Sequence, residues 1–135
     1  MNLDQKTIGL IKEFLISKLS PTLIFVFGSA ISGPFREESD IDIAILAKEE
    51  IDSYQLYLIA QELASRLSKD VDLVALSQIP TVFKAQIVAK GELIYSKDKK
   101  LGDNFKVRVL KEYTLLNEER ASILEKIEKE GKVYG

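Results

Sequence analysis

Three short segments of the chain have the hydrophobic pattern of β-strands. Residues 23–27 are continuously apolar, and isoleucine occupies every second position from 41 to 45. Residues 70–76 form a third short apolar run, with aspartates at alternate positions near its start. Because successive side chains of a strand point to opposite faces of the sheet, these patterns predict three strands, two of which carry acids on one face.

Apolar residues at helical spacing predict helices before and between these strands. A first helix is expected over about residues 3–19, ending at Ser20 and Pro21. Asp52 and Gln55 have the spacing of a capping box, and Ile51 and Leu56 that of a hydrophobic staple, so a second helix should begin here. The expected buried stripes are Ile8, Ile11, Leu15 and Leu19 in the first helix and Leu56, Ile59, Leu63 and Leu67 in the second.

Two more helices are predicted in the second half of the chain. Pro80 suits the start of a helix and Gly91 its end, which brackets a third helix from roughly residue 81 to residue 90. A last helix is expected from Asp103 to about Glu130, which is long for so small a protein. Part of it should project, so that Leu124 and Ile127 need a partner or a second copy to cover them, unless the helix folds back over the sheet.

These elements predict an α/β (α+β) fold: a small mixed β-sheet with helices packed mainly on one face and a long C-terminal helix. The chain has 135 residues, of which 46% are hydrophobic and 30% charged, enough to bury one core. We therefore expect a single domain over residues 1–135, in which about 101–130 form the C-terminal helix and a partner-binding element.

Composition and charge exclude several classes of function. The chain contains no histidine and no cysteine, so zinc sites, thiol chemistry and Ser-His-Asp hydrolysis lack their residues. A net charge of −2 lacks the basic excess of proteins that grip nucleic acid, so no stable nucleic-acid binding is expected. The N-terminus does not resemble a signal peptide and no apolar run is long enough to cross a membrane, which predicts a cytoplasmic protein.

The most informative motif is a glycine-serine pair followed, ten residues later, by Asp-x-Asp. Gly28 and Ser29 come directly after the first predicted strand, where backbone N–H groups and a hydroxyl can hold phosphate oxygens. Asp40 and Asp42 lie at the start of the second strand. Separately, these are a common turn dipeptide and common strand-edge charges. Together they indicate a phosphate cradle beside carboxylates that bind a metal.

Asp72 supplies a third carboxylate if its strand lies beside the Asp-x-Asp strand. Transfer of a nucleotidyl group develops charge on the attacking, equatorial and departing oxygens, and two divalent ions stabilise both ends of such an in-line displacement. Magnesium takes oxygen ligands and keeps several waters, so two or three carboxylates and the substrate phosphates suffice. The acids therefore predict a two-metal magnesium site.

Segments 27–33, 39–43 and 71–74 resemble the DNA polymerase β nucleotidyltransferase superfamily in its minimal single-domain form. Within that superfamily the chain looks like the MntA-like antitoxins, which are encoded beside toxins of the HEPN ribonuclease family. The similarity covers most of the chain, including the Pro80 helix, residues 91–95 and the C-terminal helix. It implies a fold like the polymerase β palm.

The resemblance implies an enzyme that transfers AMP from ATP, with magnesium, to a tyrosine of the partner toxin and thereby neutralises it. By position, Gly28 and Ser29 would hold the triphosphate, and Asp40 and Asp42 would ligate the two metal ions. Asp72 would ligate the catalytic metal and help to deprotonate the acceptor hydroxyl.

One position departs from the pattern of these relatives, which often carry Ala-Arg-Gly after the glycine-serine motif. This chain has Ile31-Ser32-Gly33, and Arg36 is the nearest residue to replace the missing arginine at the triphosphate. Two alternatives stay open. The departure at Ser32 is the main support for a catalytically silent antitoxin that acts by occlusion, although the intact acids argue against it. The other is transfer of AMP to a small molecule, as in antibiotic-modifying relatives, although little of the chain is left for a substrate domain.

Overall fold

A computed structural model describes residues 3–31 and 39–134, with side chains as far as residue 129 in the last helix. Within these ranges no helix combines the length and the apolar character that crossing a bilayer requires. The regular elements, in chain order, are α1 (Gln5–Leu19), β1 (Leu23–Phe27), β2 (Ile41–Leu46), α2 (Ser53–Leu67), β3 (Val71–Ala75), α3 (Thr81–Lys90), β4 (Glu92–Ser96) and α4 (Lys99–Tyr134), with short 3₁₀ turns at Gly28–Ala30 and Leu76–Gln78.

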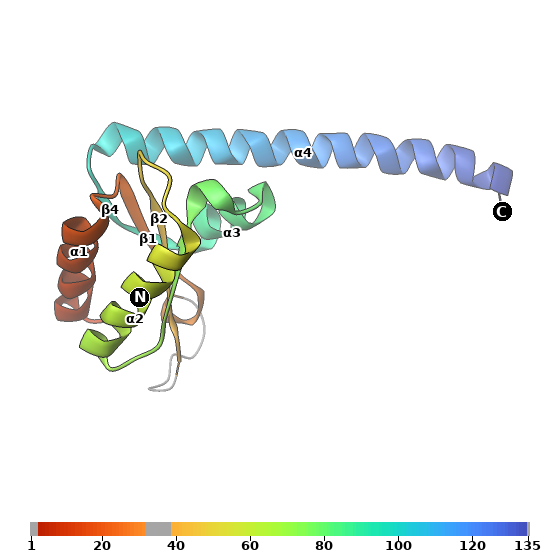
Figure 1. Ribbon diagram of the computed structural model, residues 1–135. Coiled ribbons are helices and arrows are strands. Elements are labelled where there is room, and N and C mark those ends of the chain that lie inside the picture. Colours follow the sequence, from red (N-terminus) through yellow and green to blue (C-terminus); the bar gives the residue numbers. More distant parts are fainter. Residues whose placement is uncertain (1–2, 32–38, 135) are drawn as a thin grey trace.

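The strands form one mixed sheet (Figure 1), and their order in it is β3-β2-β1-β4. β1 is antiparallel to both of its neighbours, whereas β2 and β3 are parallel and are connected through α2. A parallel pair needs such a crossover, because its two strands must start from the same edge of the sheet. β3 and β4 are therefore the edge strands.

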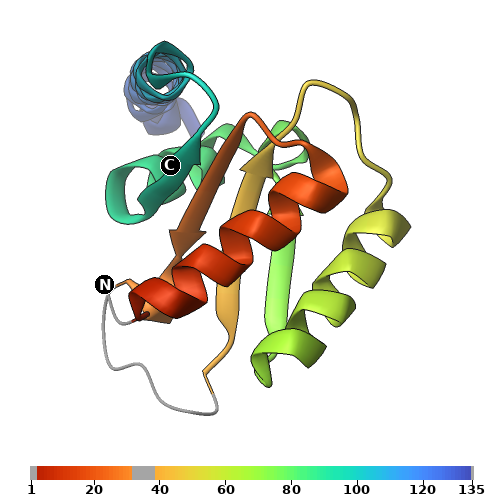
Figure 2. The same ribbon diagram turned by 90° about the vertical axis from the view of Figure 1, so that its left-hand side faces the viewer.

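The helices are divided between the two faces of the sheet (Figure 2). α1 and α2 pack on one face around Leu15, Ile43 and Leu63, and α3 and the start of α4 pack on the other around Phe25, Ile87 and Phe105. The predicted fold class is confirmed, but the expectation that helices lie mainly on one face was wrong. The central strands are apolar on both faces, so each face needs its own cover.

Helix bounds agree with the sequence pattern except where a local cap decides them. Asp4 accepts a hydrogen bond from the Thr7 amide (2.8 Å) and starts α1. Asp52 is the residue before α2, but its side chain makes no capping hydrogen bond, so the predicted capping box does not form. α4 begins four residues earlier than predicted, because the Asp98 carboxylate accepts from the Lys100 amide at 3.0 Å.

Only the first part of α4 belongs to the core. Phe105 and Val109 are buried, whereas every described side chain from residue 117 to residue 129 is exposed. At 1.5 Å per residue, the helix is about 54 Å long, and its second half extends well beyond the sheet (Figure 1). The predicted projection of the last helix is confirmed.

Candidate active site

Strand register brings two of the predicted acids side by side. Asp42 in β2 is paired with Asp72 in the neighbouring parallel strand β3. Ala44, two residues after Asp42, belongs to the core under α3 and α4. Since residues two apart share a face, Asp42 and Asp72 lie on that same face, at its uncovered end.

The Asp42 carboxyl is the most perturbed acid of the site. Burial, which is the largest cause, and the negative charges of Asp72 and Asp40 together raise its pKa to about 6. Asp42 is half-buried, while Asp40 and Asp72 are exposed. The half-buried Asp42 carboxylate, with two further acids beside it, favours a cation at this position.

Gly28 provides the room in which the Asp42 side chain lies. Phe27, the last residue of β1, is paired with Asp42, so Gly28 begins its turn beside this carboxylate. The backbone of Gly28 has a φ of +73°, and a Cβ at this position would collide with the Asp42 carboxylate. A side chain is therefore excluded by the backbone conformation and by the acid.

Ser29 lies in the 3₁₀ turn Gly28–Ala30, which packs against β2. The turn is closed by a hydrogen bond from the Ile31 amide to the Gly28 carbonyl at 3.0 Å. The predicted phosphate-holding residues therefore lie next to the predicted metal-binding acids. Ser32, which stands where relatives often carry an arginine, and Arg36, the nearest residue to replace that arginine, lie outside the described residues.

The carboxylates of Asp40, Asp42 and Asp72 are ligands of the kind that magnesium binds, but they do not form a complete metal site by themselves. Within residues 3–31 and 39–134, no three acidic, histidine or cysteine side chains converge closely enough to form a complete metal site. Carboxylates are the ligands that magnesium prefers, and the ion normally completes its octahedron with waters and substrate phosphates. Asp40, Asp42 and Asp72 could therefore hold magnesium only together with further oxygen ligands.

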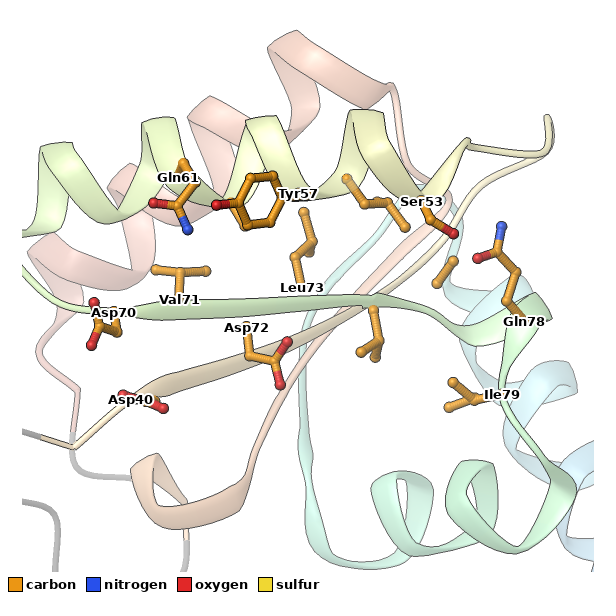
Figure 3. A pocket seen from close by; sticks show the side chains of 14 residues that line it. Asp40, Ser53, Tyr57, Gln61, Asp70, Val71, Asp72, Leu73, Gln78 and Ile79 are labelled. Atoms are coloured by element: carbon orange, nitrogen blue, oxygen red, sulfur yellow. The ribbon is translucent and has the colours of Figure 1, made fainter.

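A groove of about 590 Å³ opens beside these acids, along the outer side of β3 (Figure 3). Val71 and Leu73 point from β3 toward α2, whereas Asp72 points to the other side. The groove is lined on the helix side by Tyr57 and Gln61 and on the strand side by Asp70 and Asp72, and Asp40 also lines it.

Tyr57 and Gln61 were not predicted as site residues. They follow the buried residues Leu56 and Ala60 of α2, respectively, and so belong to the margin of its buried face. The sequence carries only a weak signal for them, an aromatic and an amide one turn apart beside an apolar stripe. Their place at the site depends on β3 being an edge strand.

The fold and this arrangement of acids define a nucleotidyltransferase. Residues 10–100 match the family model described as polymerase beta, nucleotidyltransferase, and the chain belongs to this family. The expected family, and with it the palm-like fold, is confirmed.

Comparison with individual proteins places the chain near the MntA branch. Protein adenylyltransferase MntA of Shewanella oneidensis strain MR-1 is 36% identical over 124 residues, which are 92% of this chain and 86% of that protein. A crystal structure of a toxin–antitoxin with AMP-PNP matches with a TM-score of 0.80 and 34% identity, over 89% of this chain and 97% of that chain.

A second solved structure contains a modified toxin. It is the complex of tri-AMPylated Shewanella oneidensis HEPN toxin with MNT antitoxin, and it matches with a TM-score of 0.77 and 32% identity. The match covers 93% of this chain and 98% of that chain. The expected resemblance to MntA-like antitoxins is confirmed: the chain is a homologue of a protein adenylyltransferase.

Proposed function

We propose that this protein is an antitoxin that transfers AMP from ATP to a tyrosine hydroxyl of a HEPN-family ribonuclease toxin and thereby neutralises it. The observation that carries the proposal is the pairing of Asp42 with Asp72 on one face of the sheet, beside the Gly28 turn. The homology to MntA and the AMPylated toxin of the related complex support the choice of reaction and partner.

In the proposed reaction, the tyrosine oxygen forms a bond to the α-phosphorus of ATP. The bond from that phosphorus to the oxygen bridging to the β-phosphate breaks, and pyrophosphate leaves. Magnesium, when bound, neutralises the charge that develops on the attacking and departing oxygens. The Asp72 carboxylate accepts the hydroxyl proton, while the turn at Gly28 and Ser29 orients the triphosphate.

Further residues and the long helix take part in the proposed function. Asp40, Asp42 and Asp72 ligate two magnesium ions, and Arg36 contacts the triphosphate. Residues 1–135 act as one domain, the projecting part of α4 contacts the toxin in a hetero-oligomer, and the protein acts in the cytoplasm without binding nucleic acid or membrane.

Intact mass spectrometry of the toxin, co-expressed with this protein, tests the reaction. The toxin should gain one or more AMP masses, and calorimetry should show that ATP binds in magnesium and much more weakly in a chelator. A toxin that is neutralised without any mass change would identify an occluding antitoxin instead. Equal ATP binding in chelator would remove the metal assignment.

A further inference from the structure

The outer edge of β3 is unpaired in the part of the chain that the structure describes. The Ile41 amide donates to the Asp70 carbonyl at 2.9 Å, which fixes the phase of the parallel ladder between β2 and β3. Because backbone groups alternate in direction along a strand, the N–H and C=O groups of Val71, Leu73 and Ala75 point away from β2. They face the groove described above.

This edge lacks several of the features that usually prevent a further strand from pairing, although β3 is short and carries Asp72. β3 contains no proline and no lysine, and its register with β2 is continuous, without a bulge. α2 lies beside the edge but leaves the groove open, with Tyr57 exposed to 58%. An unprotected edge of this kind is a template for strand addition.

The order of the site residues across the sheet indicates what occupies the groove. The Gly28 turn ends β1, Asp42 lies on β2, and Asp72 lies on β3, so the three follow one another toward the groove. In an in-line displacement, the attacking and departing oxygens lie on opposite sides of the α-phosphorus. With the triphosphate at the end of β1, the acceptor hydroxyl must approach from the β3 side.

We propose that the groove receives the acceptor segment of the toxin as an extended strand paired with the open edge of β3. The inference rests on the proposed function and adds to it the place and conformation of the protein acceptor. An added strand lies about 4.8 Å from β3. Its side chains directly opposite Asp72 have Cβ atoms about 4.5–5.5 Å away and point to the same face.

This geometry accounts for a tyrosine as acceptor. The tyrosine side chain is longer than that of Asp72, so its hydroxyl can reach the Asp72 carboxylate oxygens, which accept its proton in the proposed reaction. A serine hydroxyl, one bond from its Cβ, would end short of the carboxylate oxygens, which are two bonds from theirs. On the opposite side of the added strand, residues facing α2 meet the Tyr57 ring and the Gln61 amide, which provide an apolar contact and a hydrogen-bonding group.

Steady-state AMP transfer to the cognate toxin, with the full-length protein, tests the groove. The double variant Tyr57→Ala/Gln61→Ala should raise the KM for toxin at least about tenfold, the effect of losing about 1.4 kcal/mol of contact, with Mg·ATP affinity unchanged. Tyr54→Ala is the matched control, since Tyr54 lies on the same helix, is 66% exposed and does not line the groove. It should behave as wild type.

Amide hydrogen exchange, measured by NMR on the complex with toxin, tests strand pairing directly. The amides of Val71, Leu73 and Ala75 should exchange rapidly in the free protein and at least about tenfold more slowly in the complex, as paired edge amides do. The other edge strand, β4, serves as the internal reference. Protection of β4 without protection of β3 overturns the inference.

The kinetic outcomes separate this inference from the proposed function. A wild-type protein that transfers no AMP overturns both. Wild-type transfer with an equally active double variant overturns only the inference. A double variant that loses Mg·ATP affinity shows that the groove holds the nucleotide rather than the acceptor, and this also overturns it.

Discussion

The acid end of the sheet, formed by Asp40, Asp42 and Asp72, and the projecting half of α4 differ in the side chains that they bury and expose. At the acid end, strand register brings Asp42 and Asp72 together and leaves one of them half-buried. On α4, the last described turns leave Leu124 and Ile127 exposed to 65% and 57%, with no cover from the rest of the described chain. One region holds charges where a fold normally avoids them, and the other exposes apolar surface.

The two regions differ because they are stabilised by different things. The first half of α4 is fixed by apolar contact with the sheet, including Phe25 and Phe105, whose ring centroids are 6.2 Å apart. Beyond residue 116 this contact ends, although apolar residues continue along the helix. Clustered acids suggest a ligand that is a cation, and a continued apolar stripe suggests a ligand that is a protein. Removing each feature should therefore affect a different activity.

The largest expected effect is that of Asp72→Asn on catalysis. If Asp72 accepts the acceptor proton and ligates the metal, AMP transfer should fall by roughly 10²–10⁴-fold, the usual range for removing a general base. Binding to the toxin should remain, because the apolar surface of α4 is unchanged. Intact mass of the toxin and size-exclusion chromatography of the complex provide the two readouts.

Asp103→Asn is the matched control for that experiment. Asp103 is an exposed acid on α4 that does not line the groove and has no assigned role in the chemistry. The variant should transfer AMP at a rate close to wild type. If Asp72→Asn modifies the toxin as fast as Asp103→Asn does, Asp72 is only a strand-edge charge.

The next effect concerns the projecting helix. Leu124→Glu/Ile127→Glu should weaken the complex with the toxin by about 100-fold, since burying such a side chain is worth about 1.5–3 kcal/mol. Mg·ATP affinity should not change, because these residues lie far along α4 from the sheet (Figure 1). Light scattering coupled to size-exclusion chromatography measures the complex.

Ser122→Glu serves as control, because it adds a negative charge near the same turn without removing an apolar side chain. It should leave the complex nearly intact. An unchanged complex with the double glutamate variant would show that the exposed stripe is not an interface. Loss of the folded state, seen by circular dichroism, would show that these residues stabilise the domain itself.

The third effect concerns the turn at Gly28, which lies beside Asp42 and is proposed to orient the triphosphate. Gly28→Ala should destabilise the fold by about 1–2 kcal/mol, the cost of a left-handed conformation for a residue with a Cβ. It should also weaken Mg·ATP binding, since the new Cβ displaces the Asp42 carboxylate. Thermal melts and calorimetry measure the two effects.

Gly9→Ala is the matched substitution, because a Cβ at Gly9 meets no atom within 4 Å and this glycine lies inside α1. It should stabilise the protein by up to about 1 kcal/mol, as alanine does in a helix interior. Equal stability of the two alanine variants would contradict the assigned role of Gly28.

How well a feature could be predicted from the sequence depended on whether it has a local signal. Elements with local signals were predicted well: α3 begins and ends as Pro80 and Gly91 suggest. The start of α4 was missed because it depends on a cap by Asp98 rather than on apolar spacing. The shared face of Asp42 and Asp72 could be expected from alternation, given that their strands are neighbours.

Features that depend on strand order could not be predicted. The groove beside Tyr57 exists because β3 is the edge strand, and no local pattern determines that position. The Gly28 contact with Asp42 depends on the antiparallel register of β1 and β2. The continuously apolar run at residues 23–27 indicates burial on both faces, but which helices cover the second face becomes evident only when α3 and α4 pack on it.

The smallest expected effect is a pH dependence of stability in the metal-free protein. The pKa of Asp42 is raised to about 6 in the folded protein, against an ordinary value of 3.8, so the folded state binds this proton more tightly than the unfolded state does. The free energy of unfolding should therefore fall as pH rises from about 4 to 6, and Asp42 should destabilise the fold above that range. Since Asp42 is partly exposed, solvent screening should keep this contribution below about 1 kcal/mol.

Urea denaturation of wild type and Asp42→Asn in a chelator, at pH 4 and pH 7.5, isolates this contribution from that of the other acids. The asparagine variant should gain stability relative to wild type as pH rises, because it has no carboxylate to ionise. Saturating Mg·ATP should abolish the difference or reverse it, since the cation offsets the repulsion that Asp72 and Asp40 exert on Asp42. A stability difference that is constant with pH would mean that Asp42 ionises as readily in the fold as in solvent. The acid end would then hold no unfavourable charge for a cation to offset.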